Sequence, residues 1–190
     1  MGKMLDSAIE FAIKAHAGQV RKADGSPYVL HTMEAAVIAG TLTRDEAVIS
    51  ASLLHDVIEH TWATTDEIRE MFGDRVAELV EAVTEDKMTD LPAKETWRLR
   101  KIHSLRSLFD TDDEGVRIMW LANKLSNLRS MAIGVREEGD DFFKKFNQTD
   151  KELHEWYYRE VQKALISLAD TQAYEEFSAL IDEIFGEEKE

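Results

Sequence analysis

The sequence contains no cysteine, two prolines and nine glycines in 190 residues. Without cysteine the chain has no disulfide bonds, no thiolate metal ligands and no cysteine nucleophile. Its apolar runs fall short of the about 20 residues that a membrane-spanning helix needs, and its N-terminus lacks the basic and apolar regions of a signal peptide. We therefore expect a soluble, cytoplasmic protein that makes no contact with a membrane.

Positive charge is also scarce, since 23 Lys and Arg residues stand against 38 Asp and Glu residues, which gives a formal net charge of −15 at pH 7. Most of such a surface repels a phosphate backbone, so we expect no nucleic-acid partner. A small anionic ligand in a local basic pocket stays compatible with this charge. The sequence carries no signal for the oligomeric state.

Apolar residues recur at helical spacing along most of the chain, and no segment alternates as a β-strand does. We predict one all-α domain, a compact helical bundle over residues 1–186, followed by an acidic tail at 187–190. A loop is expected at 19–31, with a helix from about 32 to 40 after it. The expected N-terminal caps of later helices are Thr43, Thr64 with Glu67, Asp74, Asp112 or Asp113, and Thr149 with Glu152.

Four ionisable residues occur within six positions of the stretch LLHDVIEHT, residues 53–61. On one continuous helix His55, Asp56, Glu59 and His60 would fall within an arc of about 140°. A solvated helix face would explain such an arc, but the preceding ISASLL indicates a helix that crosses the core. Buried charges need partners or a metal. Adjacent His and Asp can both bind a divalent cation when other helices supply further ligands.

Four motifs in this order and spacing resemble the HD-domain hydrolases of the RelA/SpoT type, and most closely the stand-alone small alarmone hydrolases. The motifs are HAGQVRKADGSPYVLH (16–31), ASLLHDVIEHT (51–61), FGDRVAELVEAVTEDK (72–87) and LANKLSNLR (121–129). The segments TWRLRKIHSL and WYYREV are similar to that subgroup too. The resemblance implies an HD-domain bundle that binds Mn²⁺, or another divalent cation, and removes the 3′-pyrophosphate of (p)ppGpp.

The resemblance also implies roles for individual residues of this sequence. The implied metal ligands are His31, His55, Asp56 and Asn123. Glu59 matches a residue that orients or activates the attacking water. The residues implied to bind the anionic nucleotide are Arg21, Lys22, Lys124 and Asn127.

Two positions depart from the pattern of that family. Asn123 stands where the family has an aspartate, and His60 stands where it has an acid after Glu59. Each departure removes a negative charge near the metal. Asn123 is then a weak neutral ligand, or His60 acts as a replacement nitrogen ligand or proton carrier. A domain that binds a nucleotide without cleaving it, or one that hydrolyses another nucleotide, is a further alternative. A deliberate change at residue 123 would give the same sequence.

Two other groups of residues are left open. The basic stretch at 94–101 is compatible with the rim of an anion pocket, although a charge run is more often a solvated face. Trp156, Tyr157 and Tyr158 are compatible with a stacking surface for a base. Aromatic residues at helical spacing are usually core residues, so we do not assign these three to the site.

Overall fold

The computed structural model describes residues 2–85, 88 and 92–186, so the predicted acidic tail at 187–190 lies outside the described residues. Within the described ranges the chain forms helices and no strand, which confirms the predicted all-α bundle. None of these helices is long and apolar enough to cross a membrane. The elements are α1 (Lys3–Ala15), α2 (Tyr28–Leu42), α3 (Glu46–Leu54), α4 (Val57–His60), α5 (Thr65–Phe72), α6 (Asp74–Val83), α7 (Ala93–Asp110), α8 (Glu114–Glu138), the 3₁₀ helix η1 (Gly139–Lys145), α9 (Lys151–Ala164), the 3₁₀ helix η2 (Ile166–Leu168) and α10 (Gln172–Phe185).

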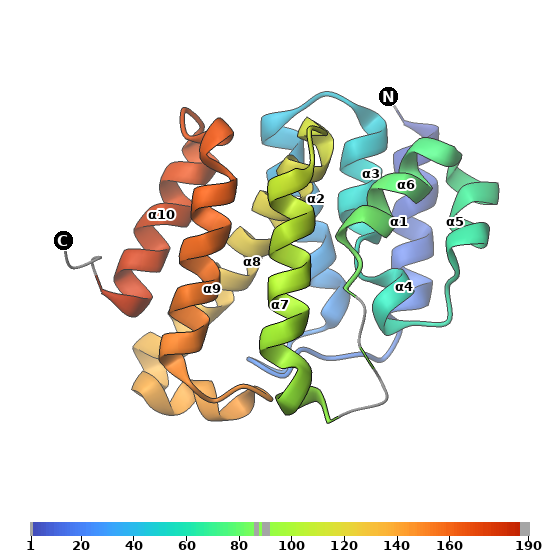
Figure 1. The fold of residues 1–190 in the computed structure, drawn as a ribbon. Coiled ribbons are helices and arrows are strands. Elements are labelled where there is room, and N and C mark those ends of the chain that lie inside the picture. Colours follow the sequence, from blue (N-terminus) through green and yellow to red (C-terminus); the bar gives the residue numbers. More distant parts are fainter. Residues whose placement is uncertain (1, 86–87, 89–91, 187–190) are drawn as a thin grey trace.

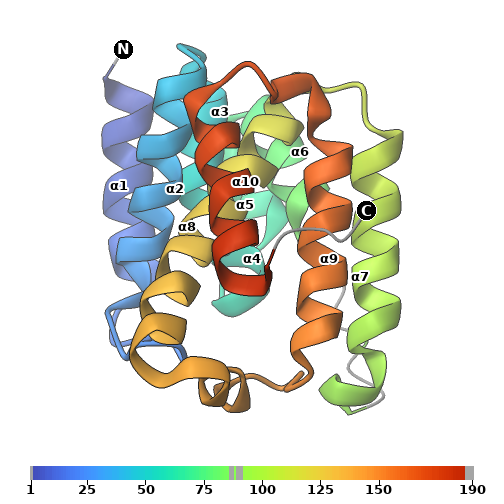
Figure 2. The same cartoon turned by 90° about the vertical axis from the view of Figure 1, so that its left-hand side faces the viewer.

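The long helix α8 is the centre of the bundle. It packs against α2, α3, α6, α10 and η1. In Figure 1, α9 and α10 lie to the left, α7 lies in front of α8, and α1, α3, α5 and α6 lie to the right, beyond α2. Figure 2 shows α10 over α8, with α9 and then α7 beside it. Leu121, Leu125 and Leu128 of α8 are fully buried, as expected for a helix covered on several sides.

Helix α2 begins earlier than the sequence predicted. Tyr28 is its first residue and Pro27 is its N-terminal cap, so the prediction of a loop up to residue 31 is wrong. Proline fits this position because it fixes φ and because the first amides of a helix need no acceptor inside the helix. A β-bridge between Val20 and Pro27 closes the preceding loop. His31 therefore lies in the first turn of a helix.

The predicted continuous helix through residues 51–61 is interrupted at its polar pair. Helix α3 ends at Leu54, and α4 begins only at Val57. Asp56 has φ −101° and ψ −2°, which lies in the bridge region between the regular conformations. The arc of about 140° assumes one continuous helix. It is therefore wrong, because the helix is interrupted between the pair His55–Asp56 and Glu59.

Several helix starts follow the predicted capping chemistry. The Thr64–Glu67 capping box is present, and Asp113 caps α8 through the amide of Gly115. Three caps were predicted wrongly. Asp45, not Thr43, caps α3, and Asp150, not Thr149, caps α9, because these carboxylates reach the free amides of the first turn. Asp74 makes no capping hydrogen bond and is the first residue of α6.

Gly134 of α8 is required by close packing. A Cβ atom at this position would overlap the ring of Phe142 in η1. We expect Gly134→Ala to lower the free energy of unfolding by about 1–3 kcal/mol through overpacking, as measured by urea denaturation. The matched control is Gly40→Ala in α2, whose Cβ would meet Ile49 at 3.9 Å. It should raise stability by about 0.5–1 kcal/mol, because alanine favours a helix. Equal stability of the two variants would contradict the packing at Gly134.

Candidate functional site

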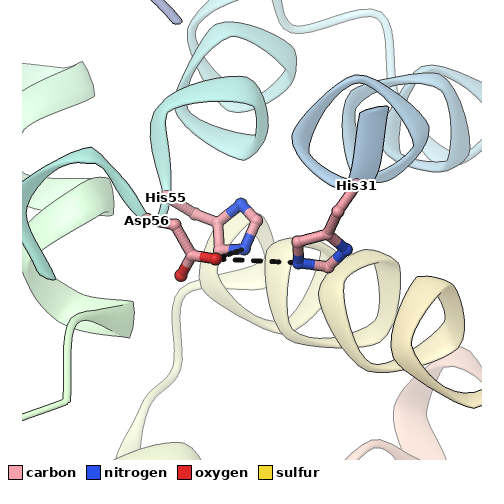
Figure 3. Close-up of side chains that lie close together, drawn as sticks. All are labelled: His31, His55 and Asp56. Carbon is pink, nitrogen blue, oxygen red and sulfur yellow. Dashed lines mark ion pairs between the residues drawn. The ribbon is translucent and has the colours of Figure 1, made fainter. Parts of the chain in front are cut away.

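Two histidines and an aspartate meet at the junction of α2 with α3 and α4 (Figure 3). The Oδ2 atom of Asp56 lies 3.2 Å from Nε2 of His55 and 3.7 Å from Nε2 of His31. All three residues are buried, with relative exposures of 3% to 8%. Their nitrogen and oxygen atoms lie close enough together to hold one metal ion. The break between α3 and α4 turns Asp56 toward His31, which is 25 positions earlier in the chain.

The orientation of the His55 ring is fixed by the main chain. Its Nδ1 atom lies 2.8 Å from the carbonyl oxygen of Ser52, and a carbonyl only accepts hydrogen bonds. Nδ1 therefore carries the proton, and Nε2 presents a lone pair toward Asp56. This Nε2 atom is buried and has no hydrogen-bond partner within the part of the chain that the structure describes. A buried lone pair without a donor fits a metal ligand, and the remaining ring N–H has the partner that metal-binding histidines usually have.

The ionisation states in the cluster also fit a divalent cation. Burial lowers the pKa of His31 well below its usual value, and the neighbouring His55 lowers it further. Burial opposes ionisation of Asp56, but the interactions with His55 and then His31 outweigh it and hold its pKa well below the usual range. Tyr28 donates a hydrogen bond of 2.7 Å to Oδ2 of Asp56. A neutral imidazole and an ionised carboxylate are the forms that bind metal.

Glu59 and His60 extend the cluster toward solvent. Their side chains approach each other, with 3.5 Å between Oε1 of Glu59 and Nε2 of His60. Together with Asp56 they form a second group whose ligand atoms lie within 4.8 Å of one another. Gln19 donates a hydrogen bond of 2.9 Å to the carbonyl oxygen of His60, which ties the first loop to α4. The two groups share Asp56, so the second one lies at the entrance to the first.

Asn123 lines a cavity together with His31 and Asp56. The orientation of its side-chain amide is defined by hydrogen bonds. Arg21 donates through Nη2 to Oδ1 of Asn127 at 2.8 Å, and a guanidinium can only donate. The Nδ2 atom of Asn127 then donates to Oδ1 of Asn123 at 2.8 Å. The carbonyl oxygen of Asn123 is therefore already a hydrogen-bond acceptor. It offers its remaining lone pair, without a negative charge, to any cation in the cavity.

The cavity around the cluster has a volume of about 170 Å³, and it combines acidic and basic groups. A second cavity of about 200 Å³ adjoins it, and the described residues that line it include basic and aromatic groups but no acid. The first is lined by Tyr28, His31, Asp56, Glu59, His60, Val83, Glu85, Lys101, Ser104, Trp120, Asn123, Lys124, Asn127 and Tyr157. The second is lined by Arg21, Ala23, Trp97, Lys101, Lys124, Asn127, Met131, Phe146, His154, Tyr157 and Tyr158.

Lys124 lies where the two cavities meet. Its Nζ atom is 4.9 Å from the centre of the Trp120 ring and 5.9 Å from that of Tyr157. Burial lowers the pKa of the Lys124 amine to about 8, and the neighbouring Lys101 acts in the same direction. Lys101 is itself paired with Glu85 at 2.7 Å. The shared wall is therefore positively charged, with an aromatic surface beside it.

Some site residues differ from those singled out in the sequence. Lys22 is exposed and lines neither of the two cavities. Tyr157 is buried as a core residue, and it also lines both cavities. Its use as a stacking surface for a base stays a prediction. Tyr28 lies within the first motif, but nothing in its spacing indicated a hydrogen bond to Asp56. Lys101 belongs to the basic stretch at 94–101, and its pairing with Glu85 is a tertiary contact without a local signal.

Comparisons with known proteins agree with this geometry. Residues 8–149 match the HD domain family. The GTP pyrophosphokinase Rsh of Brucella ovis is 36% identical over 135 residues, which are 71% of this chain and 18% of the relative. The guanosine-3′,5′-bis(diphosphate) 3′-pyrophosphohydrolase of Aquifex aeolicus is 36% identical over 134 residues, 70% of this chain and 18% of that protein. The chain thus spans less than a fifth of the length of these relatives.

A solved structure of a metazoan ortholog of SpoT, described as hydrolysing ppGpp, has a TM-score of 0.77 and 24% identity to this chain. The match covers 98% of each chain and shows a shared fold. The resemblance to RelA/SpoT-type HD domains that the four motifs predicted is confirmed by these relatives. Since the family match covers most of the sequence and the His55–Asp56 pair lies at the centre of the site, the chain belongs to the HD domain family.

Proposed function

We propose that this protein is a divalent-metal-dependent hydrolase that removes the 3′-pyrophosphate of (p)ppGpp. The observation that carries the proposal is the position of the His31–His55–Asp56 cluster beside a basic, aromatic cavity. A guanosine polyphosphate has one aromatic part and two anionic parts, which suits this pair of cavities. The relative in Aquifex aeolicus, whose name gives the same reaction, supports the choice of substrate. The proposal places the protein in the cytoplasm.

Each residue of the site has a role in this proposal. His31, His55 and Asp56 would hold the cation, with Asn123 as a weak fourth ligand. A divalent cation supplies Lewis acidity, because it polarises a phosphoryl oxygen and lowers the pKa of a neighbouring water. We assign Mn²⁺ as this cation. Histidine and carboxylate ligands also suit other divalent metals, so the assignment follows the resemblance to the small alarmone hydrolases.

The other residues bind substrate and move protons. Glu59 lies at the entrance to the cluster, where its carboxylate can orient the attacking water and accept its proton. His60 contacts Glu59 at 3.5 Å and can carry that proton toward solvent. The nucleotide phosphates would bind Arg21 and Lys124, and Asn127 holds the Arg21 side chain by a hydrogen bond. Lys22, which is exposed, would contact a phosphate only outside the cavities.

A second candidate function is nucleotide binding without cleavage. Asn123 favours it, because its oxygen is neutral and already accepts a hydrogen bond from Asn127. His60 stands where the family pattern has an acid, so the entrance of the site has one negative charge fewer than in that pattern. Calorimetry with ppGpp separates the two functions. A sensor binds ppGpp and releases no product, whereas an enzyme releases product when Mn²⁺ is present.

The direct test of the proposal is hydrolysis of ppGpp by the purified chain with Mn²⁺. We expect GDP and pyrophosphate in equal amounts, and no product when a chelator removes the metal. Binding of ppGpp without product would instead establish the second candidate function. Cleavage of a different nucleotide but not of ppGpp would place the protein elsewhere among HD phosphohydrolases and would overturn the proposed substrate.

Replacing Asn123 by aspartate should tighten Mn²⁺ binding by about tenfold or more, which corresponds to about 1.4 kcal/mol. One carboxylate oxygen can accept the existing hydrogen bond from Asn127 while the other, now charged, faces the cation. Titration with Mn²⁺ at equal pH and salt measures the gain. The matched control is Asn147→Asp at an exposed position, which should leave the affinity within about twofold.

Two outcomes of this titration would change the account of Asn123. Equal affinity of Asn123→Asp and the unaltered protein would mean that residue 123 is not a ligand. Tighter binding without faster hydrolysis would place the catalytic defect at His60. Metal titration and hydrolysis are measured on the same preparations of the unaltered protein and Asn123→Asp. Comparison of their circular dichroism detects any difference in folding.

A further inference from the structure

A chain of hydrogen bonds connects the Nδ1 atom of His31, on the side of the ring away from Asp56, to a carboxylate outside the two cavities. The Nδ1 atom of His31 lies 2.8 Å from Oγ of Ser126 on α8. The same hydroxyl donates to Oε2 of Glu34 at 2.6 Å. Ser126 is fully buried and Glu34 is about one-third exposed. Neither residue lines the cavity that His31 and Asp56 line.

The number of protons in these hydrogen bonds determines which ring nitrogen of His31 is unprotonated. Glu34 accepts from Ser126 through one oxygen and from the Arg129 guanidinium, at 2.9 Å, through the other. Both oxygens accept, as the oxygens of a carboxylate do. A hydroxyl has one proton, and Ser126 gives it to Glu34, so its oxygen must accept from His31. Nδ1 of His31 therefore carries the proton, and Nε2 presents a lone pair toward Asp56.

The tautomer of His31 is held differently from that of His55. A main-chain carbonyl, that of Ser52, fixes His55, and no side-chain replacement removes it. A serine hydroxyl can donate as well as accept, so Ser126 alone would permit either tautomer of His31. In water the Nε2–H tautomer of histidine is the favoured one. The tautomer of His31 therefore depends on Glu34, because Glu34 accepts the hydroxyl proton of Ser126.

We propose that Glu34 is a positioning residue, which acts through Ser126 to keep the Nε2 atom of His31 unprotonated and so available to the metal. The proposal rests on the metal centre of the proposed function and does not depend on the substrate. A partner behind the ligating histidine commonly changes metal affinity by about 10- to 100-fold. Neither Glu34 nor Ser126 touches the cation or the reacting atoms in this account.

Glu34 is itself held by a network that reaches the C-terminal helix. Arg129 makes two hydrogen bonds with Glu176 of α10, at 2.6 Å and 2.7 Å, and one with Glu34. These bonds, first those with Glu176 and then that with Glu34, raise the pKa of the Arg129 guanidinium. Helix α10 lies beyond residues 8–149, which match the HD domain family. Glu176 thus contacts the same arginine as Glu34 but not Ser126.

The test is Glu34→Gln, which keeps the size of the side chain and reverses the direction of its hydrogen bond with Ser126. Arg129 would still donate to the amide oxygen, so the amide NH₂ would face Ser126 and donate to it. The Ser126 proton would then turn to Nδ1 of His31 and leave a proton on Nε2. Nitrogen-15 NMR of the metal-free protein reports the tautomer directly, with the His31 signals assigned by their absence in His31→Gln.

We expect the His31 proton on Nδ1 in the unaltered protein and on Nε2 in Glu34→Gln. The affinity for Mn²⁺, measured by electron paramagnetic resonance of the free ion, should fall by about 10- to 100-fold. Ser126→Ala should give a similar loss, because it removes the acceptor for Nδ1–H. The matched control is Glu176→Gln, which likewise removes one negative charge from a carboxylate that pairs with Arg129. It should leave the tautomer unchanged and the affinity within about threefold.

Three results would overturn the proposal. They are an unprotonated Nδ1 in the unaltered protein, an unchanged tautomer in Glu34→Gln, and equal losses of affinity in Glu34→Gln and Glu176→Gln. Failure of the metal centre itself is distinguished by His55→Gln. If that variant binds Mn²⁺ as tightly as the unaltered protein, the proposed function has lost its metal site. The NMR result for His31 is independent of that outcome, because it is obtained without metal.

Discussion

Replacing Asp56 by asparagine should weaken Mn²⁺ binding by about 100-fold or more, a larger effect than that of residues behind the ligands. Asp56 supplies the only carboxylate of the His31–His55–Asp56 group, and its Oδ2 atom lies within 3.7 Å of both ring nitrogens. An amide at this position keeps the shape of the side chain but removes the buried negative charge that faces the cation. Hydrolysis of ppGpp should be lost at metal concentrations that saturate the unaltered protein.

The matched control for this variant is Asp66→Asn in α5. Asp66 is an almost fully exposed carboxylate that pairs with Arg69 on the surface. Its replacement makes the same change in net charge and should alter the Mn²⁺ affinity by less than about twofold, since exposed charges are screened by salt. Circular dichroism establishes that both variants are folded. Retention of tight Mn²⁺ binding by Asp56→Asn would show that the cluster is not the metal centre.

Glu59→Gln should lower the rate of hydrolysis at saturating substrate by about 10²- to 10⁴-fold, the scale of a lost general base. Glu59 approaches Asp56 and His60 but does not belong to the buried group of His31 and His55. The affinity for Mn²⁺ should therefore stay within about threefold. Steady-state kinetics and metal titration of one protein preparation separate these two effects.

Glu70→Gln on the exposed surface of α5 is the matched control for Glu59→Gln. It should leave both the rate and the Mn²⁺ affinity unchanged. If Glu59→Gln instead loses Mn²⁺ affinity as strongly as Asp56→Asn, then Glu59 is a metal ligand and does not act on the water. An unchanged rate would remove Glu59 from the catalytic machinery and would favour His60 as the proton acceptor.

The helices were largely predictable because their signals are local. The helical spacing of apolar residues predicted the all-α class, the cap of α8 was predicted at Asp112 or Asp113, and the capping box at Thr64 and Glu67 is formed by residues three positions apart. The break after Leu54 was not predictable in the same way. Residues 51–61 have the composition of a continuous helix, and the interruption at Asp56 accompanies its burial beside His31 from another helix. Tertiary contacts override local propensity at such positions.

The site was predictable only where a motif carried it. The resemblance selected His31, His55 and Asp56, which the structure brings together, and Arg21 and Asn127, which it joins by a hydrogen bond. The residues behind His31 were not found. Ser126 is 95 positions from His31 and 92 from Glu34, and contacts at that separation leave no local pattern. Ser126 is a small residue in an apolar helix, which fits close helix packing equally well.

The central claim is that His31, His55 and Asp56 form a divalent-metal centre. Crystals of the unaltered protein soaked in Mn²⁺ test it most directly, through the anomalous signal at the manganese absorption edge. The account predicts one strong peak within coordination distance of Nε2 of His31, Nε2 of His55 and Oδ2 of Asp56. The absence of a peak there at millimolar Mn²⁺, or a peak bounded by other residues, would contradict it.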